Sequence, residues 1–245
     1  MQNTAKTYST FNLFIRSSIF FLYSGISIAL YSFLCICSFP FPLRYRQWLI
    51  RTYLRFYIYL LKIICHVDYR VHGLENIPTT RKGVILCKHQ STWETFFLPT
   101  LFHNLAIILK RELLWVPFFG WGLATLDPIA IDRRKKASAM QQIIEKGKKC
   151  LADGRWILVF PEGTRMPVGH AGKYQLGGAR LAIAANCPII PIAHNAGRFW
   201  PRKSFIKHPG VIQVIVGPVI ESEGRTPEEL MGLAKAWIET TAAEM

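Results

Sequence analysis

The chain has 245 residues, of which 51% are hydrophobic, and its formal net charge is +15. This length suits one ordinary domain, while so high a hydrophobic share is unusual for a soluble domain and favours membrane association. The positive charge calls for an acidic partner, namely anionic lipid, nucleic acid or a phosphorylated substrate. The six cysteines show no CxxC or Cys/His ligand spacing, so they are expected to be reduced thiols, and no metal site is predicted.

The first 66 residues contain no acidic side chain and form the predicted membrane-anchoring segment. Residues 17–39 are uncharged and long enough to span a bilayer, and two prolines at 40 and 42 end this helix. A second helix, basic and aromatic, is expected over residues 45–65. Two topologies stay open: a single span, or a hairpin within one leaflet whose second helix lies at the interface. We expect residues 1–66 to anchor the chain without taking part in its chemistry.

From residue 67 to 245, strand patterns alternate with helix patterns, which predicts one α/β domain with a mixed β-sheet flanked by helices. Strands are expected at 67–71, 84–87, 105–109, 128–133, 156–159, 189–193 and 211–216. Helices are expected after residue 91, over 137–151 and 179–185, and from Pro227, with Thr226 as the cap of the last one.

Two further expectations concern the segment 116–121 and Asp132. The apolar segment 116–121 is expected to form a turn, which either packs in the core or contacts an acyl chain or the membrane. Asp132, at the end of a short strand, is expected to cap the helix that follows it.

A functional site is predicted where the apolar strand 84–87 ends, because His89 and Glu94 follow it closely. Open α/β sheets bind their ligands at this end of the strands. A carboxylate beside an imidazole fixes its tautomer and stabilises the imidazolium, as a general base requires. The alternative is that residues 91–94 form a helix capping box and that His89 is structural.

A second polar block, residues 160–165, has the sequence Phe-Pro-Glu-Gly-Thr-Arg and directly follows the apolar run 156–159. Because two strands of one sheet end in charged, turn-rich segments, we expect both segments to face one shared cleft.

Taken together, these blocks resemble the 1-acyl-sn-glycerol-3-phosphate acyltransferase family, within the wider glycerolipid acyltransferase group. The resemblance covers about residues 67–220, and the four ordered motifs of the family match residues 89–94, 131–133, 160–165 and 189–192. Three positions depart from the family pattern. Glu94 stands where Asp is usual, Lys88 where Asn is common, and Gln175 where many members have Lys.

The resemblance implies that residues 67–245 are an acyltransferase catalytic domain. Its implied reaction moves a fatty acyl group from an acyl carrier protein or coenzyme A thioester to the sn-2 hydroxyl of 1-acyl-glycerol-3-phosphate, giving phosphatidic acid. No cofactor is implied, because the thioester is already activated. The resemblance also implies a position on the cytoplasmic face of the inner membrane, bound to membrane lipid, with no nucleic-acid partner.

The same resemblance assigns roles to individual residues. His89 and Glu94 are the expected catalytic pair. The expected substrate-binding residues are Glu162, Gly163, Thr164, Arg165, Arg133 and Lys173. Arginine suits the acceptor phosphate because its guanidinium binds oxygens in pairs. Glu162 is expected either to orient the acceptor or to fix Arg165 in place.

Two alternatives to this function remain open at the level of sequence. One keeps the chemistry but changes the acceptor to a lyso-amino-lipid or another lysophospholipid. The other is a non-enzymatic, basic protein that binds a membrane surface or nucleic acid, although no zinc-finger or RNP-type motif is present.

Overall fold

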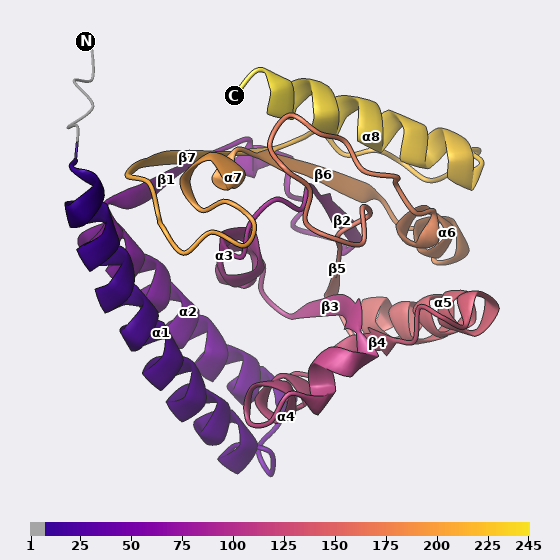
Figure 1. Cartoon of the computed structure of the whole chain (residues 1–245). Coiled ribbons are helices and arrows are strands. Elements are labelled where there is room, and N and C mark those ends of the chain that lie inside the picture. Colours follow the sequence, from indigo (N-terminus) through magenta and orange to yellow (C-terminus); the bar gives the residue numbers. More distant parts are fainter. Residues whose placement is uncertain (1–7) are drawn as a thin grey trace.

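Seven strands form one mixed sheet in the order β1-β7-β6-β2-β5-β3-β4, in a computed structural model that describes residues 8–245 (Figure 1). All neighbouring strands run parallel except β6 and β7, which are antiparallel. The strands are β1 (Val67–His72), β2 (Val84–Cys87), β3 (Leu105–Lys110), β4 (Ile129–Ile131), β5 (Trp156–Val159), β6 (Ile189–His194) and β7 (Gly210–Val216). The predicted mixed α/β sheet is therefore confirmed.

Helices cover both faces of this sheet, and their bounds follow the sequence pattern closely. The α-helices are α1 (Thr10–Cys37), α2 (Leu43–Cys65), α3 (Trp93–Leu101), α4 (Phe119–Ala124), α5 (Lys136–Ala152), α6 (Gly177–Ala184), α7 (Ala196–Phe199) and α8 (Pro227–Ala243). Two 3₁₀ helices are η1 (Leu74–Asn76) and η2 (Arg111–Trp115). The predicted start of α8 is confirmed, with a complete capping box between Thr226 and Glu229.

Alternation along β2 divides the interior into two hydrophobic clusters, because successive side chains of a strand point to opposite faces. Ile85 and Cys87 face the cluster under α2 and α3. Val84 and Leu86 face the cluster under α5, α6 and α8. All four side chains are fully buried, so β2 is a central strand, and the chain that follows it emerges between the two helical layers.

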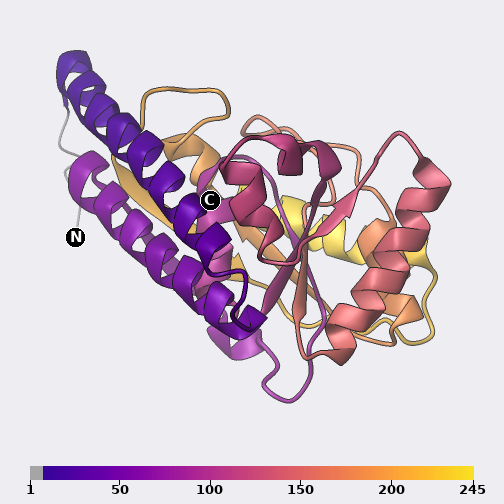
Figure 2. The same cartoon turned by 90° about the horizontal axis from the view of Figure 1, so that it is seen from below.

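The N-terminal helices α1 and α2 run antiparallel and side by side along one flank of the sheet (Figures 1 and 2). Polar side chains join them across the hairpin, with Ser27 Oγ 3.0 Å from Tyr53 Oη and Ser24 Oγ 2.9 Å from Tyr57 Oη. Of the helices in the described part of the chain, α1 alone is long and apolar enough to cross a membrane. Residues 1–7 of the predicted anchoring segment lie outside the described residues.

One local expectation holds in part and one is wrong. Residues 116–118 form a turn between η2 and α4, whereas residues 119–121 belong to α4. Asp132 does not cap α5, which begins at Lys136 without a side-chain cap. Its carboxylate instead binds two guanidinium groups, those of Arg111 at 2.9 Å and Arg134 at 3.2 Å. In these bonds both partners are charged, whereas a helix cap would pair the carboxylate with uncharged backbone N–H groups.

Candidate active site

His89 and Glu94 lie in direct contact in the connection between β2 and α3. Glu94 Oε1 is 2.9 Å from His89 Nδ1, and it also accepts hydrogen bonds from the backbone N–H groups of Gln90 (2.9 Å) and Ser91 (2.8 Å). The Glu94 side chain is fully buried, whereas 14% of the His89 side chain is exposed. The Glu94 carboxylate thus orients the His89 imidazole and also binds the backbone at the start of α3. It therefore serves both as the partner of the predicted base and as the capping group of the alternative interpretation.

The ionised form of Glu94 fixes the tautomer of His89. Burial by itself would raise the pKa of Glu94, but the neighbouring His194 and His89, with the Ser91 N–H, hold that pKa below its usual value. An ionised carboxylate only accepts hydrogen bonds, so His89 donates from Nδ1–H and keeps its lone pair on Nε2. No group within residues 8–245 hydrogen-bonds to this Nε2, which is free to take a proton from a substrate.

A second histidine, His194 at the end of β6, lies behind Glu94 and was not predicted as part of the site. Its Nδ1 accepts from the N–H of Ala196 at 3.2 Å, so its Nε2–H donates to the carbonyl of Lys88 at 2.8 Å. Burial lowers the pKa of His194, which agrees with this neutral form. The only sequence signal for His194 is its place directly after the Pro-containing strand 189–193.

The segment 160–165 closes against His89 from the end of β5. The Phe160 ring stacks on the His89 imidazole, with 4.1 Å between ring centroids. The N–H of Met166, just beyond the segment, donates to the carbonyl of His89 at 2.7 Å. Gly163 has a φ of +69°, a left-handed conformation that favours glycine. Both polar segments therefore form one cleft, as the sequence predicted.

Two arginines lie on the open side of this cleft. Arg133 donates to the carbonyl of Gly163 and thereby supports the turn that carries Arg165. Burial lowers the pKa of Arg133, although a guanidinium keeps its charge in proteins. Arg165 is half-buried, and within residues 8–245 its guanidinium has no carboxylate partner. Its charge is thus available to an anion of the substrate.

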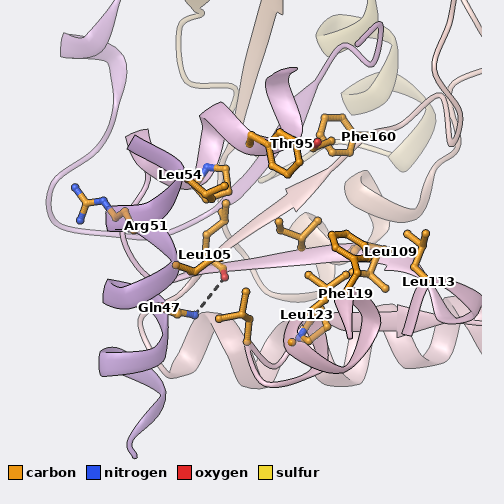
Figure 3. A pocket seen from close by; sticks show the side chains of 18 of the residues that line it. Gln47, Arg51, Leu54, Thr95, Leu105, Leu109, Leu113, Phe119, Leu123 and Phe160 are labelled. Atoms are coloured by element: carbon orange, nitrogen blue, oxygen red, sulfur yellow. Dashed lines mark hydrogen bonds between the residues drawn. The ribbon is translucent and has the colours of Figure 1, made fainter. Parts of the chain in front are cut away.

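One cavity of about 760 Å³ joins His89, Gly163, Thr164 and Arg165 to a long apolar space between the N-terminal helices and the sheet. Figure 3 shows side chains from α2, β3 and α4 around this space. Its apolar lining includes Ile28, Tyr31, Leu54, Phe96, Leu105, Leu109, Phe119 and Leu123. A charged end and an apolar end thus meet at the imidazole, which suits a ligand with an anionic head and a hydrocarbon tail.

Comparison with known proteins agrees with this arrangement. The acyltransferase family matches residues 68–195. A 1-acyl-sn-glycerol-3-phosphate acyltransferase of Pseudomonas aeruginosa is 48% identical over 237 residues, covering 94% of this chain and 91% of that protein. The chain belongs to the 1-acyl-sn-glycerol-3-phosphate acyltransferase family. It is an O-acyltransferase, so the non-enzymatic alternative is wrong.

More distant members of the acyltransferase family agree. The mouse 1-acyl-sn-glycerol-3-phosphate acyltransferase alpha is 31% identical over 184 residues, which cover 74% of this chain and 65% of that protein. The crystal structure of the 1-acyl-sn-glycerophosphate acyltransferase PlsC from Thermotoga maritima has a TM-score of 0.78 and covers 94% of both chains. Its sequence identity is 21%, so this likeness concerns the fold.

Two of the predicted substrate-binding residues of this acyltransferase do not line the cavity. Glu162 is buried behind His89, where Oε2 accepts from the His89 N–H at 2.9 Å and Oε1 accepts from the Gly172 N–H at 3.1 Å. It holds the backbone of His89 and contacts neither an open substrate space nor the Arg165 side chain. Lys173 is exposed and away from the cavity lining, so its position gives no support to a role in phosphate binding.

Proposed function

We propose that this acyltransferase moves a fatty acyl group from a coenzyme A or acyl carrier protein thioester to the sn-2 hydroxyl of 1-acyl-glycerol-3-phosphate, giving phosphatidic acid for phospholipid synthesis. The observation that carries the proposal is the meeting of His89, an unpaired Arg165 and an apolar cavity at one place. The relatives from Pseudomonas aeruginosa and mouse are 1-acyl-sn-glycerol-3-phosphate acyltransferases, which supports the same acceptor.

His89 acts as the general base in this reaction. The acceptor hydroxyl gives its proton to His89 Nε2 as its oxygen attacks the thioester carbonyl carbon. The new C–O bond forms, the C–S bond breaks, and the imidazolium returns the proton to the departing thiolate. Glu94 stabilises the imidazolium through the 2.9 Å contact with Nδ1. We assign no metal or cofactor to the reaction, because the thioester is already an activated acyl donor.

Arg165 binds the phosphate of the acceptor, supported by Arg133 and the turn at Gly163. A phosphate monoester carries up to two negative charges and offers several acceptor oxygens, which match the forked donors of a guanidinium. Thr164 lines the same end of the cavity and adds a hydroxyl donor. The hydrocarbon chains then extend along the apolar end, where each buried methylene contributes about 0.8 kcal/mol to binding.

We assign to the α1–α2 hairpin the role of holding this cavity at a membrane surface. One face of α1 exposes large apolar side chains along its whole length, from Phe11 (73% exposed) to Ile26 (72%) and Phe33 (54%). The exposed aromatic residues Phe118 and Trp121 of the α4 region lie next to α1, because Gly122 packs against Ser32. We assign this continuous apolar surface to contact with lipid, which favours the membrane interpretation of residues 116–121.

Both ends of α1 are held by the catalytic layer, which supports the hairpin in one leaflet over a single span. Near its start, Ser17 Oγ accepts from the backbone N–H of Lys207 at 3.0 Å, and near its end Ser32 contacts Gly122. A helix crossing the bilayer would have to leave these contacts. A protease site inserted before Ser9 should therefore be cleaved from the catalytic side of sealed vesicles. Cleavage only from the opposite side would contradict the hairpin.

We further propose that this side is the cytoplasmic face of the inner membrane. All six cysteines are unpaired, five of them buried, which suits a reducing compartment. The basic side chains of α2, among them Arg44 and Arg55, would then face the anionic lipid of the cytoplasmic leaflet.

The proposed function is tested by a purified acyl-transfer assay with lysophosphatidate and either acyl-coenzyme A or acyl carrier protein thioester. We expect phosphatidic acid acylated at sn-2 as the product. Lysophosphatidylcholine, whose phosphate is a diester with a single negative charge balanced by its choline, should react far more slowly, because Arg165 then meets less negative charge and fewer free phosphate oxygens. A faster reaction with lysophosphatidylcholine or with a lyso-amino-lipid would overturn the proposed acceptor.

A further inference from the structure

A lysine directly before the catalytic base is buried and paired with two carboxylates. Lys88 is 1% exposed, and its Nζ lies 2.7 and 2.8 Å from the two oxygens of Glu239 in α8. The same nitrogen is 3.3 Å from Glu162 Oε1 and 3.3 Å from the carbonyl oxygen of His170. Removing an ammonium group from water costs several kcal/mol unless it is paired. These partners provide that pairing, so the lysine is fixed in one position.

The partners of Lys88 lead directly to the base. Glu162 uses its other oxygen, Oε2, to accept from the backbone N–H of His89 at 2.9 Å. Glu239 Oε1 also accepts from Tyr174 Oη at 2.8 Å, which joins α8 to the loop after residue 165. A continuous set of hydrogen bonds therefore runs from the C-terminal helix through Lys88 and Glu162 to the backbone of His89.

Resting on the proposed function, we propose that Lys88 and Glu239 are positioning residues, which together hold Glu162 and, through it, the backbone of His89 in the reactive geometry. Asparagine, which is common at position 88 in the family, carries no charge and could not balance the buried carboxylate of Glu162 and the partly buried one of Glu239, whereas Lys88 does so. Glu239 lies 151 positions away in sequence, so the C-terminal helix of this chain becomes part of the support for its active site.

The network predicts a specific effect of removing Glu239. Lys88 would then have Glu162 as its remaining carboxylate partner and draw it away from the His89 N–H. A displacement of a catalytic group by about 1 Å costs up to about 10²-fold in rate. We expect Glu239→Ala to lower kcat between about tenfold and 10²-fold, with little change in either KM, because no residue of α8 lines the cavity assigned to the substrates. Glu239→Gln, which keeps a hydrogen-bond acceptor for Lys88, should recover most of this loss.

Glu228→Ala is the matched control, since Glu228 is an exposed carboxylate on the same helix. This variant should keep wild-type kcat. If Glu239→Ala and Glu228→Ala had the same kcat per folded enzyme, or if Glu239→Ala lowered only the melting temperature, the positioning role would be wrong.

The double variant Lys88→Met/Glu239→Ala provides the decisive test. Lys88→Met alone leaves the buried carboxylate of Glu162 and the partly buried one of Glu239 without a cation, so we expect a loss of about 10²-fold in kcat. Removing Glu239 as well relieves their repulsion, so the double variant should be more active than Lys88→Met alone. Losses that simply multiply would show that the two residues act independently and would overturn the proposal.

Amide hydrogen exchange separates this proposal from the proposed function, because it needs no substrate. The peptide containing His89 should exchange faster in Glu239→Ala than in the wild type or in Glu228→Ala, since the Glu162 contact with the His89 N–H is weakened. Unchanged exchange would contradict the network even in an active enzyme. A wild type that exchanges as expected but does not acylate lysophosphatidate would contradict the proposed function alone.

Discussion

The two ends of the cavity are built by different kinds of interaction. At the charged end, the carboxylates of Glu94 and Glu162 are held by hydrogen bonds at 2.8–3.1 Å. At the apolar end, Leu109, Phe119 and Leu123 are held only by packing between separate elements. Hydrogen bonds fix the orientation of the side chains at the charged end, whereas packing fixes the volume available to a ligand at the apolar end. Changes at the charged end should therefore affect rate and acceptor binding, and changes at the apolar end should affect the choice of chain.

The largest effect is expected for His89→Ala, which removes the base. A positioned general base contributes about 10²–10⁴-fold, so kcat should fall by that factor. The melting temperature should stay close to that of the wild type, because the side chain is partly exposed and packs mainly on Phe160. Retention of more than about a tenth of the activity would show that His89 is not the base.

Glu94→Gln tests whether the charge of this residue matters or only its hydrogen bonds. Glutamine keeps an oxygen that can accept from Gln90 and Ser91 but no longer stabilises an imidazolium. We expect kcat to fall by about 10²-fold or more, with a small change in stability. Lost stability with preserved specific activity would mean that Glu94 serves α3 rather than His89.

Arg165→Lys keeps the positive charge and removes the forked donor pair. The KM for lysophosphatidate should rise about tenfold, while the KM for the thioester changes little. Steady-state kinetics with each substrate varied in turn measures both constants. An equal rise in the two would indicate that Arg165 holds the loop 160–165 rather than the acceptor phosphate.

The smallest effect is expected at the apolar end. Leu109→Phe should reduce the space for a hydrocarbon chain. For each methylene group that no longer fits, the preference for the shorter chain should rise about fourfold. Leu233→Phe, at an exposed site on α8, is the matched control and should leave the preference unchanged. Competition between thioesters or lysophosphatidates of different chain length measures the shift. The same preference in both variants would contradict the assignment of this end to the chain.

The residues at the charged end of the cavity could be predicted from the sequence because they directly follow the ends of strands. The segments 89–94 and 160–165 each follow a fully apolar strand, and parallel strands bring their ends to one edge. Even Glu94, five residues from His89, is within reach of a single turn. Residues that follow these strand ends in the sequence therefore lie close together in the fold.

The remaining parts depend on contacts that no local pattern encodes. His194 and Glu239 reach the site from β6 and α8, and nothing in their neighbouring residues distinguishes them from ordinary polar residues. The apolar wall combines residues of α1, α2, α3, β3 and α4, whose arrangement follows from tertiary packing. The expectation that residues 1–66 anchor the chain without taking part in its chemistry stays a prediction, although several of these residues also line the cavity. The division at residue 66 stays a prediction.

The most direct test of the account is a structure with 2-deoxy-lysophosphatidate, an acceptor analogue that lacks the hydroxyl to be acylated. We expect its phosphate to lie within hydrogen-bond distance of the Arg165 guanidinium. Carbon 2 of its glycerol should face His89 Nε2, with the acyl chain extending toward Leu109. A phosphate bound to the exposed lysines of α5 instead, with the His89 cavity empty, would contradict the assignment of this cavity to acyl transfer.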